Sequence, residues 1–111
     1  MSSLTANVVN KTDLTVIASA NPPSHGLPPN ILNPTVEHGS TKDSVFVANS
    51  DGAGVEGSVS LTGNGVKFTL NYDNPVVGTN SGSVTWPDGY SGSCQAGGGT
   101  NATFTYTIGP A

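Results

Sequence analysis

Alternation of apolar and polar side chains is clearest in the stretch Val66-Lys67-Phe68-Thr69-Leu70-Asn71-Tyr72. Every second residue from Val66 to Tyr72 is apolar and the residues between are polar, which is the pattern of a β-strand with one buried face. The preceding stretch, residues 55–62, alternates in the same way. Because apolar residues nowhere keep a helical spacing over three turns, the sequence predicts an all-β protein.

Between these two stretches, Gly63-Asn64-Gly65 predicts a tight hairpin turn. Asn64-Gly65 suits a type I′ turn and Gly63-Asn64 a type II′ turn, and the resulting registers differ by two residues. The first register places Glu56 directly opposite Asp73, where like charges are unfavourable, so the strands should fray there unless the second register holds. The sequence leaves both registers open.

Five further stretches have the composition of short strands: residues 4–10, 14–19, 44–49, 83–86 and 102–108. With the hairpin they make seven strands, and an eighth is expected within residues 95–101 or within residues 31–36. Seven to eight short strands joined by frequent turns predict a small antiparallel β-sandwich, forming one domain over residues 1–111. We expect its core to contain Val59, Leu61, Phe68, Leu70, Phe104 and Tyr106.

Two segments without strand patterns are expected to be long loops, where binding residues usually lie. Residues 21–34 hold five of the eight prolines, and residues 87–100 are dominated by Gly and Ser. Trp86 and Tyr90 flank the turn sequence Pro87-Asp88-Gly89. If exposed, this aromatic pair would form a platform for a sugar or an anchor at a lipid interface. Trp86 packed inward, as one large core residue, is the alternative.

The composition limits the classes of molecule that the protein is expected to bind. Charged residues make up 9% of the chain, where about 25% is usual. The net charge of −4 argues against nucleic acid and anionic lipid surfaces as partners. The single cysteine, Cys94, can form no intramolecular disulfide and is expected to be a buried, inert thiol. Without a signal-peptide pattern or a long apolar run, we expect a soluble protein that is cytoplasmic or released by a non-classical route.

Catalytic motifs are missing from the sequence. It contains no Gly-x-Ser-x-Gly elbow, no phosphate-binding Gly-rich loop and no Cys-x-x-Cys pair. His25 and His38 are isolated and are expected to be solvated loop residues, although a pair of either with Cys94 stays open. Asp51 and Asp88 precede glycines, in turn contexts that explain them without calcium. We therefore expect no enzymatic activity, no cofactor and no metal site.

Two blocks of the sequence resemble the aegerolysin family. The first is Ser-Asp-Gly-Ala-Gly-Val-Glu-Gly-Ser-Val at residues 50–59, and the second is Tyr-Asp-Asn-Pro-Val-Val-Gly-Thr-Asn at residues 72–80. Other strands of the family are similar to residues 8–12, 46–49 and 104–108, so the resemblance covers nearly the whole chain. It is closest to the bacterial branch that includes the small component of binary insecticidal crystal proteins. Lipid-binding members carry a tryptophan after the proline of the second block, where this chain has Val76-Val77.

The resemblance implies a small acidic β-sandwich that recognises particular membrane lipids, often sphingolipids, and acts with a larger pore-forming protein. The lipid site that it implies lies at a rim of the sandwich, because Asp73-Asn74-Pro75 ends a strong strand. Its expected members are Tyr72, Asp73, Asn74, Pro75, Asn80, Trp86 and Tyr90. Two other functions stay open: a lectin-like module that binds glycans, and a structural protein that packs into crystals or coats.

Overall fold

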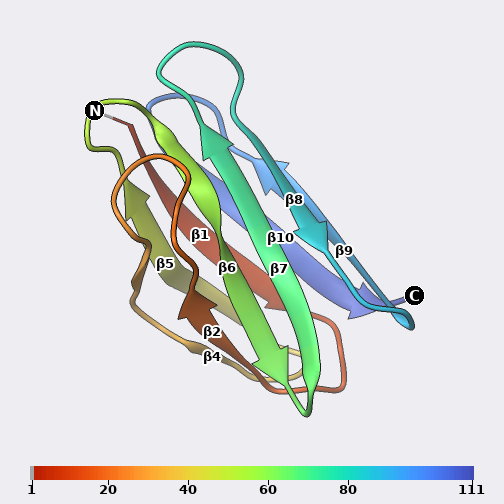
Figure 1. The fold of residues 1–111 in the computed structure, drawn as a ribbon. Helices are drawn as coiled ribbons and strands as arrows, with labels where there is room; N and C mark the ends of the chain where they lie inside the picture. Colours follow the sequence, from red (N-terminus) through yellow and green to blue (C-terminus); the bar gives the residue numbers. More distant parts are fainter. Residues whose placement is uncertain (1) are drawn as a thin grey trace.

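The computed structural model describes residues 2–111, and its regular secondary structure is entirely β-strand. Ten strands form two five-stranded sheets packed face to face (Figure 1). Sheet A contains, in spatial order, β3 (Asn30–Ile31), β5 (Thr41–Asn49), β1 (Ser3–Asn10), β10 (Asn101–Pro110) and β9 (Tyr90–Ala96). Sheet B contains β4 (Thr35–Val36), β2 (Val16–Ala20), β6 (Val55–Gly63), β7 (Val66–Asn74) and β8 (Ser81–Thr85). The all-β sandwich is confirmed. The structure has more strands than expected, because it also contains β3 and β4, which are too short to recognise in the sequence at two residues each.

Two strands from opposite ends of the sequence lie side by side in the middle of sheet A. β1 pairs with β10 in parallel through eight residue pairs, from Ser3 with Asn101 to Asn10 with Ile108. The other strand pairs within residues 2–111 are antiparallel. The sandwich is therefore mostly antiparallel, with one long parallel pairing at its centre.

The β6–β7 hairpin adopts the first of the two registers. Asn64 and Gly65 both have positive φ angles, 48° and 76°, as a type I′ turn requires. Pairing continues past Glu56 and Asp73, which lie directly opposite each other, and reaches Val55 with Asn74. The expectation that the strands fray at this charge pair is therefore wrong.

The Gly- and Ser-rich segment 87–100 is not a single loop, because it contains the seven-residue strand β9. β9 pairs with β10 from Tyr90 with Pro110 to Ala96 with Phe104. Its small residues permit close contact with the edge of sheet B: a β-carbon at Gly92 would lie 2.5 Å from a methyl group of Val84. The expected extra strand is therefore at Tyr90–Ala96 rather than residues 95–101, and residues 31–36 hold only β4 and the last residue of β3.

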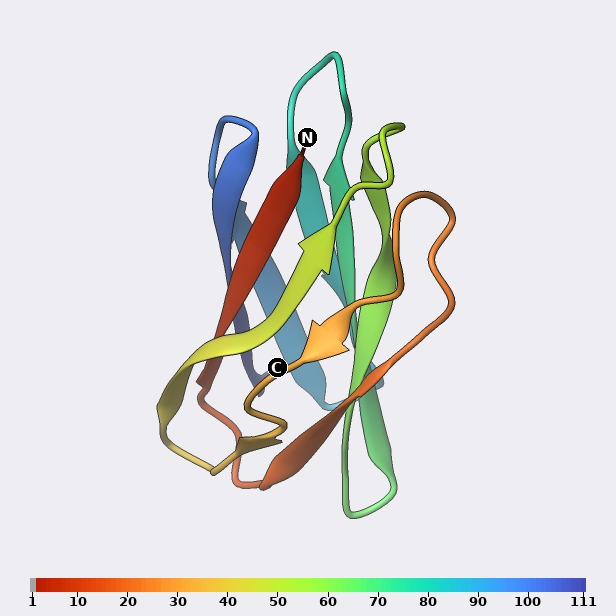
Figure 2. The ribbon, with the colours of Figure 1, turned by 90° about the vertical axis from the view of Figure 1, so that its left-hand side faces the viewer.

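The core lies between the sheets. All six residues expected there, from Val59 to Tyr106, are fully buried. One end of the sandwich, which we call the loop end, carries the loops at residues 21–29, 50–54, 75–80 and 97–100 (Figure 2). The opposite end, which we call the hairpin end, carries the β6–β7 and β8–β9 turns (Figure 1).

Candidate functional site: two hollows at the loop end

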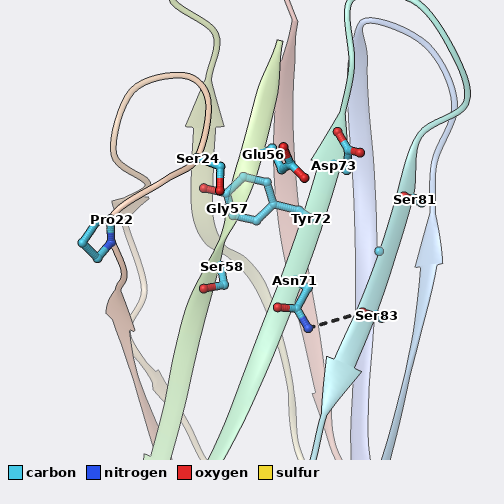
Figure 3. A pocket seen from close by; sticks show the side chains of 11 residues that line it. Pro22, Ser24, Glu56, Gly57, Ser58, Asn71, Tyr72, Asp73, Ser81 and Ser83 are labelled. Atoms are coloured by element: carbon cyan, nitrogen blue, oxygen red, sulfur yellow. Dashed lines mark hydrogen bonds between the residues drawn. The ribbon is translucent and has the colours of Figure 1, made fainter.

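Sheet B is hollowed on its outer face, close to the loop end (Figure 3). This hollow, which we call the groove, has a volume of about 470 Å³. Hydroxyl, amide and carboxylate side chains dominate its lining, because outward-facing positions of β6, β7 and β8 meet here with the β2–β3 loop. The polar lining residues are Ser24, Glu56, Ser58, Asn71, Asp73, Ser81 and Ser83.

Two carboxylates lie next to each other in the groove. Glu56 on β6 is the direct cross-strand neighbour of Asp73 on β7. Partial burial and the negative charge of Glu56 raise the pKa of Asp73, and His25 acts in the opposite direction. His25 Nδ1 lies 3.0 Å from Glu56 Oε1, and the backbones of His25 and Glu56 form a β-bridge. His25 and His38 are both exposed loop residues, as expected, and His25 in addition contacts Glu56.

Tyr72 faces the core rather than solvent. Its side chain is almost fully buried, and its ring packs 5.7 Å from the ring of Phe46. The ring extends toward Gly57 and the segment that carries Ser24 (Figure 3). Its hydroxyl is buried and has no hydrogen-bond partner within residues 2–111, and burial raises the pKa of Tyr72 to about 12.

A second hollow, which we call the cleft, lies between the β7–β8 and β9–β10 loops and has a volume of about 250 Å³. Asn74, Pro75 and Asn80 line it, so three of the expected site residues meet here. Asn74 is buried, and its amide donates to the carbonyl of Ser3 at 3.0 Å. The amide of Asn80 donates to the carbonyls of Gly97 and Gly99, both at 2.9 Å. These two asparagines therefore hold the loops in place through their amide nitrogens.

The tip of the β7–β8 loop exposes two apolar residues that our expected site did not include. Val76 is 60% exposed and Val77 is 88% exposed, and Val76 also lines the cleft. The signal was present in the sequence, since two adjacent valines between Pro75 and a glycine suit an exposed turn better than a strand. Sequence reasoning placed Glu56 opposite Asp73 in only one of two registers, and it missed the contact of Glu56 with His25, because His25 comes from a distant segment.

Trp86 and Tyr90 lie away from both hollows, toward the hairpin end. Trp86 follows Thr85, whose cross-strand partner is Thr69, whereas Asn74 lies five residues further along β7. At about 3.3 Å per residue, this separates Trp86 from the cleft by roughly 15 to 20 Å. Trp86 is 49% exposed and is not a core residue. Tyr90 is half-buried, with its ring edge-on to Phe68 at 5.3 Å, so the two aromatic side chains do not form an exposed pair.

Other chemistry in the described residues is sparse. No group of three or more His, Cys, Asp and Glu side chains within residues 2–111 is placed to hold a metal ion. The thiol of Cys94 is partly buried, and burial raises its pKa to about 11. Cys94 is the cross-strand neighbour of Tyr106, whereas the His25 side chain contacts Glu56. Nor does any helix in residues 2–111 have the length and apolar character needed to cross a membrane.

Comparisons with known proteins bear on the fold. No protein-family model matches the sequence, and no curated protein matches it. Among solved structures, IP-1A from Alcaligenes faecalis matches with a TM-score of 0.52 and 16% sequence identity. The match covers 98% of this chain and 91% of that chain. At this identity the likeness concerns the fold alone, and it shows that this chain and IP-1A share one β-sandwich architecture.

Proposed function

We propose that this protein recognises membrane lipid through its loop end and serves as the small, non-enzymatic component of a two-part pore-forming toxin of the insecticidal kind. The resemblance of residues 50–59 and 72–80 to aegerolysins motivates the proposal, and the fold shared with IP-1A is compatible with it. A larger partner protein would insert into the membrane, and this chain would select the lipid.

The observation that carries the proposal is the exposure of Val76 and Val77 at the tip of the β7–β8 loop. They occupy the position after Pro75 at which lipid-binding aegerolysins carry a tryptophan. An exposed apolar loop tip beside a small polar cleft matches the two parts of a lipid, because acyl chains favour apolar contact and a head group needs hydrogen bonds.

Charge favours a neutral or zwitterionic head group of the sphingolipid type. The three lysines lie toward the hairpin end: Lys67 pairs with Thr62 beside the β6–β7 turn, Lys42 pairs with Val8, and Lys11 follows β1. The loop end therefore lacks the basic side chains that attract anionic lipid. In the cleft, Asn80 and the backbone of the glycine-rich β9–β10 loop line the space open to a head group.

The small size of the apolar contact supports a role for a partner protein. Burying one valine completely is worth about 1.5 to 3 kcal/mol, so two partly exposed valines add only a few kcal/mol. Stable membrane attachment takes at least two such signals. Head-group binding in the cleft would supply the second, and the partner would make the attachment permanent.

Cosedimentation with vesicles tests the proposal. Vesicles that contain a zwitterionic sphingolipid should bind the wild-type protein more strongly than vesicles of an anionic glycerophospholipid. Val76→Ser and Val77→Ser should each lower the bound fraction severalfold. Ile17→Thr is the matched control, because Ile17 is also exposed, at 55%, but lies on β2 away from the loop end.

The same experiment has a clear negative outcome. Equal binding of both valine variants and wild type would exclude the loop tip as the lipid contact. Failure of the wild-type protein to bind any vesicle, with and without a pore-forming partner, would contradict lipid recognition itself.

A further inference from the structure

One side of the sandwich has its sheet edges covered by the chain itself. On that side β3 pairs with β5 and β4 pairs with β2, so residues 30–36 run along the outer strands of both sheets (Figure 2). The backbone nitrogen of Leu32 donates to the carbonyl of Val45 at 2.9 Å, and that of Ala18 donates to the carbonyl of Pro34 at 2.8 Å. These contacts occupy backbone groups that an edge strand would otherwise offer to another chain.

The opposite side of the sandwich has no such cover. It is formed by β8, the last strand of sheet B, and β9, the last strand of sheet A (Figure 1). Within residues 2–111, β8 pairs only with β7, and β9 pairs only with β10. Neither strand contains a bulge, a proline or a lysine. The features that usually prevent pairing between exposed strand edges are therefore absent from β8 and β9.

This open side is also nearly uncharged, although the protein is acidic. The net charge is −4, yet Asp88 is the only Asp, Glu, Lys or Arg after residue 73. Two copies of the chain that met through β9 would therefore bring no like charges into contact. In an antiparallel pair the two Asp88 side chains would lie at opposite ends of the contact, because Asp88 lies just before the start of β9. A charged partner, in contrast, would find no opposite charge along this edge.

An exposed tryptophan at the same side is a second, independent observation. Trp86 lies in the β8–β9 turn, directly after β8, and is 49% exposed. It is distant from both hollows, so the proposed lipid contact does not use it. Tryptophan is enriched among the residues that contribute most to protein–protein contacts, because its ring buries a large apolar area. The open edge and Trp86 together therefore indicate a surface that another protein chain covers.

We propose that two copies of this protein associate through their β9 strands, which pair antiparallel about a two-fold axis. Pairing over the full strand places Tyr90 opposite the partner's Ala96, and the central residue Ser93 opposite the partner's Ser93. Sheet A then continues from one copy into the other. The partner's Gly97 follows beyond the start of β9, beside the turn that carries Trp86. Two-fold symmetry is the commonest arrangement of homodimers, and this inference does not depend on the proposed lipid recognition.

The contact is small, so the dimer should be weak. The seven residues of β9 span roughly 23 Å, and one strand edge with one tryptophan buries less than the about 1,600 Å² of a typical stable interface. We expect a dissociation constant on the order of tens of micromolar, so that a dilute sample is monomeric.

Sedimentation velocity of the wild-type protein tests the association. Raising the concentration from about 5 to about 500 µM should convert the monomer to a dimer. The buffer contains a reducing agent, which excludes a disulfide between two Cys94 thiols. A monomer at every concentration would overturn the proposal. Assemblies that grow beyond a dimer would also overturn it, because a two-fold contact closes.

Two charge variants at the centre of β9 test the pairing itself. Ser93 is exposed and points outward, because its neighbours Gly92 and Cys94 face sheet B and the core. Opposed side chains in an antiparallel pair lie about 4.5 to 5.5 Å apart, so Ser93→Lys and Ser93→Glu should each weaken self-association severalfold through like-charge repulsion. An equimolar mixture of the two variants should associate more strongly than either variant alone. A mixture that associates no better would exclude pairing through β9.

A matched control places the same charge on the covered side of the sandwich. Thr41 is also exposed on sheet A, but it lies on β5, so Thr41→Lys should leave self-association unchanged. Equal weakening by Thr41→Lys and Ser93→Lys would indicate a general charge effect and overturn the assignment. Trp86→Ala should weaken the dimer severalfold, and association equal to wild type would contradict the placement of Trp86 at the contact. Circular dichroism that matches wild type shows that each variant is folded.

The lipid contact and the self-association surface can fail separately. Ser93→Lys should retain vesicle binding, and Val77→Ser should retain self-association, so each result reports on its own proposal. Loss of self-association in Val77→Ser would move the contact to the loop end and contradict its assignment to β9.

Discussion

The hydroxyl of Tyr72 occupies the space that a side chain on its cross-strand neighbour Gly57 would need. A β-carbon at Gly57 would lie 2.6 Å from this hydroxyl and 3.0 Å from the ring carbon that carries it. Such distances are shorter than normal packing allows, so tyrosine at residue 72 requires glycine at residue 57.

Gly57→Ala should therefore destabilise the protein by about 1 to 3 kcal/mol through overpacking. Gly98→Ala is the control, because a β-carbon at Gly98 meets nothing within 4 Å. Adding Tyr72→Phe to Gly57→Ala should recover part of the loss, since the phenylalanine ring lacks the oxygen that the new methyl group strikes. Chemical denaturation of wild type, both single variants, the double variant and the Gly98→Ala control measures these effects. Strictly additive effects of Gly57→Ala and Tyr72→Phe would disprove the contact.

Phe68→Ala should cost about 3 to 5 kcal/mol of unfolding free energy, because Phe68 is fully buried and supports the ring of Tyr90. Its neighbour Lys67 points outward, and Lys67→Ala should change the stability by about 0.5 kcal/mol or less. A denaturant midpoint for Phe68→Ala close to that of wild type would mean that the two faces of β7 are reversed.

Trp86 is the single tryptophan, so its fluorescence reports on the hairpin end. Because it is half exposed, Trp86→Ala should leave the thermal midpoint within a few degrees of wild type. Vesicles should not shift its emission if lipid contacts the loop end. Val77→Trp in a Trp86→Phe background should instead shift to the blue with the same vesicles. A blue shift of Trp86 itself would place the lipid contact at the hairpin end.

Cys94 should react slowly with thiol reagents. The thiolate is the reactive species, and burial raises the pKa of Cys94 from 9.0 to about 11, so far less thiolate is present at pH 8 than in an unfolded chain. We expect modification of the folded protein to be at least about tenfold slower than modification of the same protein in denaturant. Equal rates would show that the thiol is freely exposed.

Stability should fall at alkaline pH in two stages. The folded pKa values of Cys94 and Tyr72, about 11 and about 12, lie above the ordinary 9.0 and 10.0, so folding favours the protonated forms. Their contribution is complete below pH 9 and is lost progressively as the pH rises toward 12. Cys94→Ala should remove the decline that begins near pH 9, and Tyr72→Phe the decline that begins near pH 10. Denaturant midpoints that stay constant from pH 8 to pH 11 would contradict both shifts.

The sequence predicted the hairpin well because its information is local. Alternation assigned the buried faces of β6 and β7, and Gly63-Asn64-Gly65 limited the register to two choices. The structure adopts the register that places Glu56 opposite Asp73, and His25, which lies 31 positions before Glu56, contacts the Glu56 side chain. No local pattern could reveal that contact.

The sequence did not predict β9, because its residues have weak strand preferences. Gly, Ser and Cys neither alternate strongly nor prefer extended structure, and the strand exists because β10 pairs with its full length. The residues of the expected lipid site lie in separate parts of the structure for a related reason. Asp73-Asn74-Pro75 correctly marked the end of a strand, but the chain then reverses along β8 and carries Trp86 to the other end of the sandwich.

The parallel pairing of β1 with β10 determines how the sandwich bears mechanical load. Ser3 begins β1 at the loop end, and Pro110 ends β10 toward the opposite end, so the chain leaves this pair in opposite directions (Figure 1). Tension applied through Ser3 and Pro110 therefore slides the two strands past each other. The evenly spaced hydrogen bonds of the parallel ladder then share the force and must rupture together, rather than opening one at a time. A partner that pulled on both ends of the domain would load the β1–β10 pairing in shear, the direction in which this pairing resists force best.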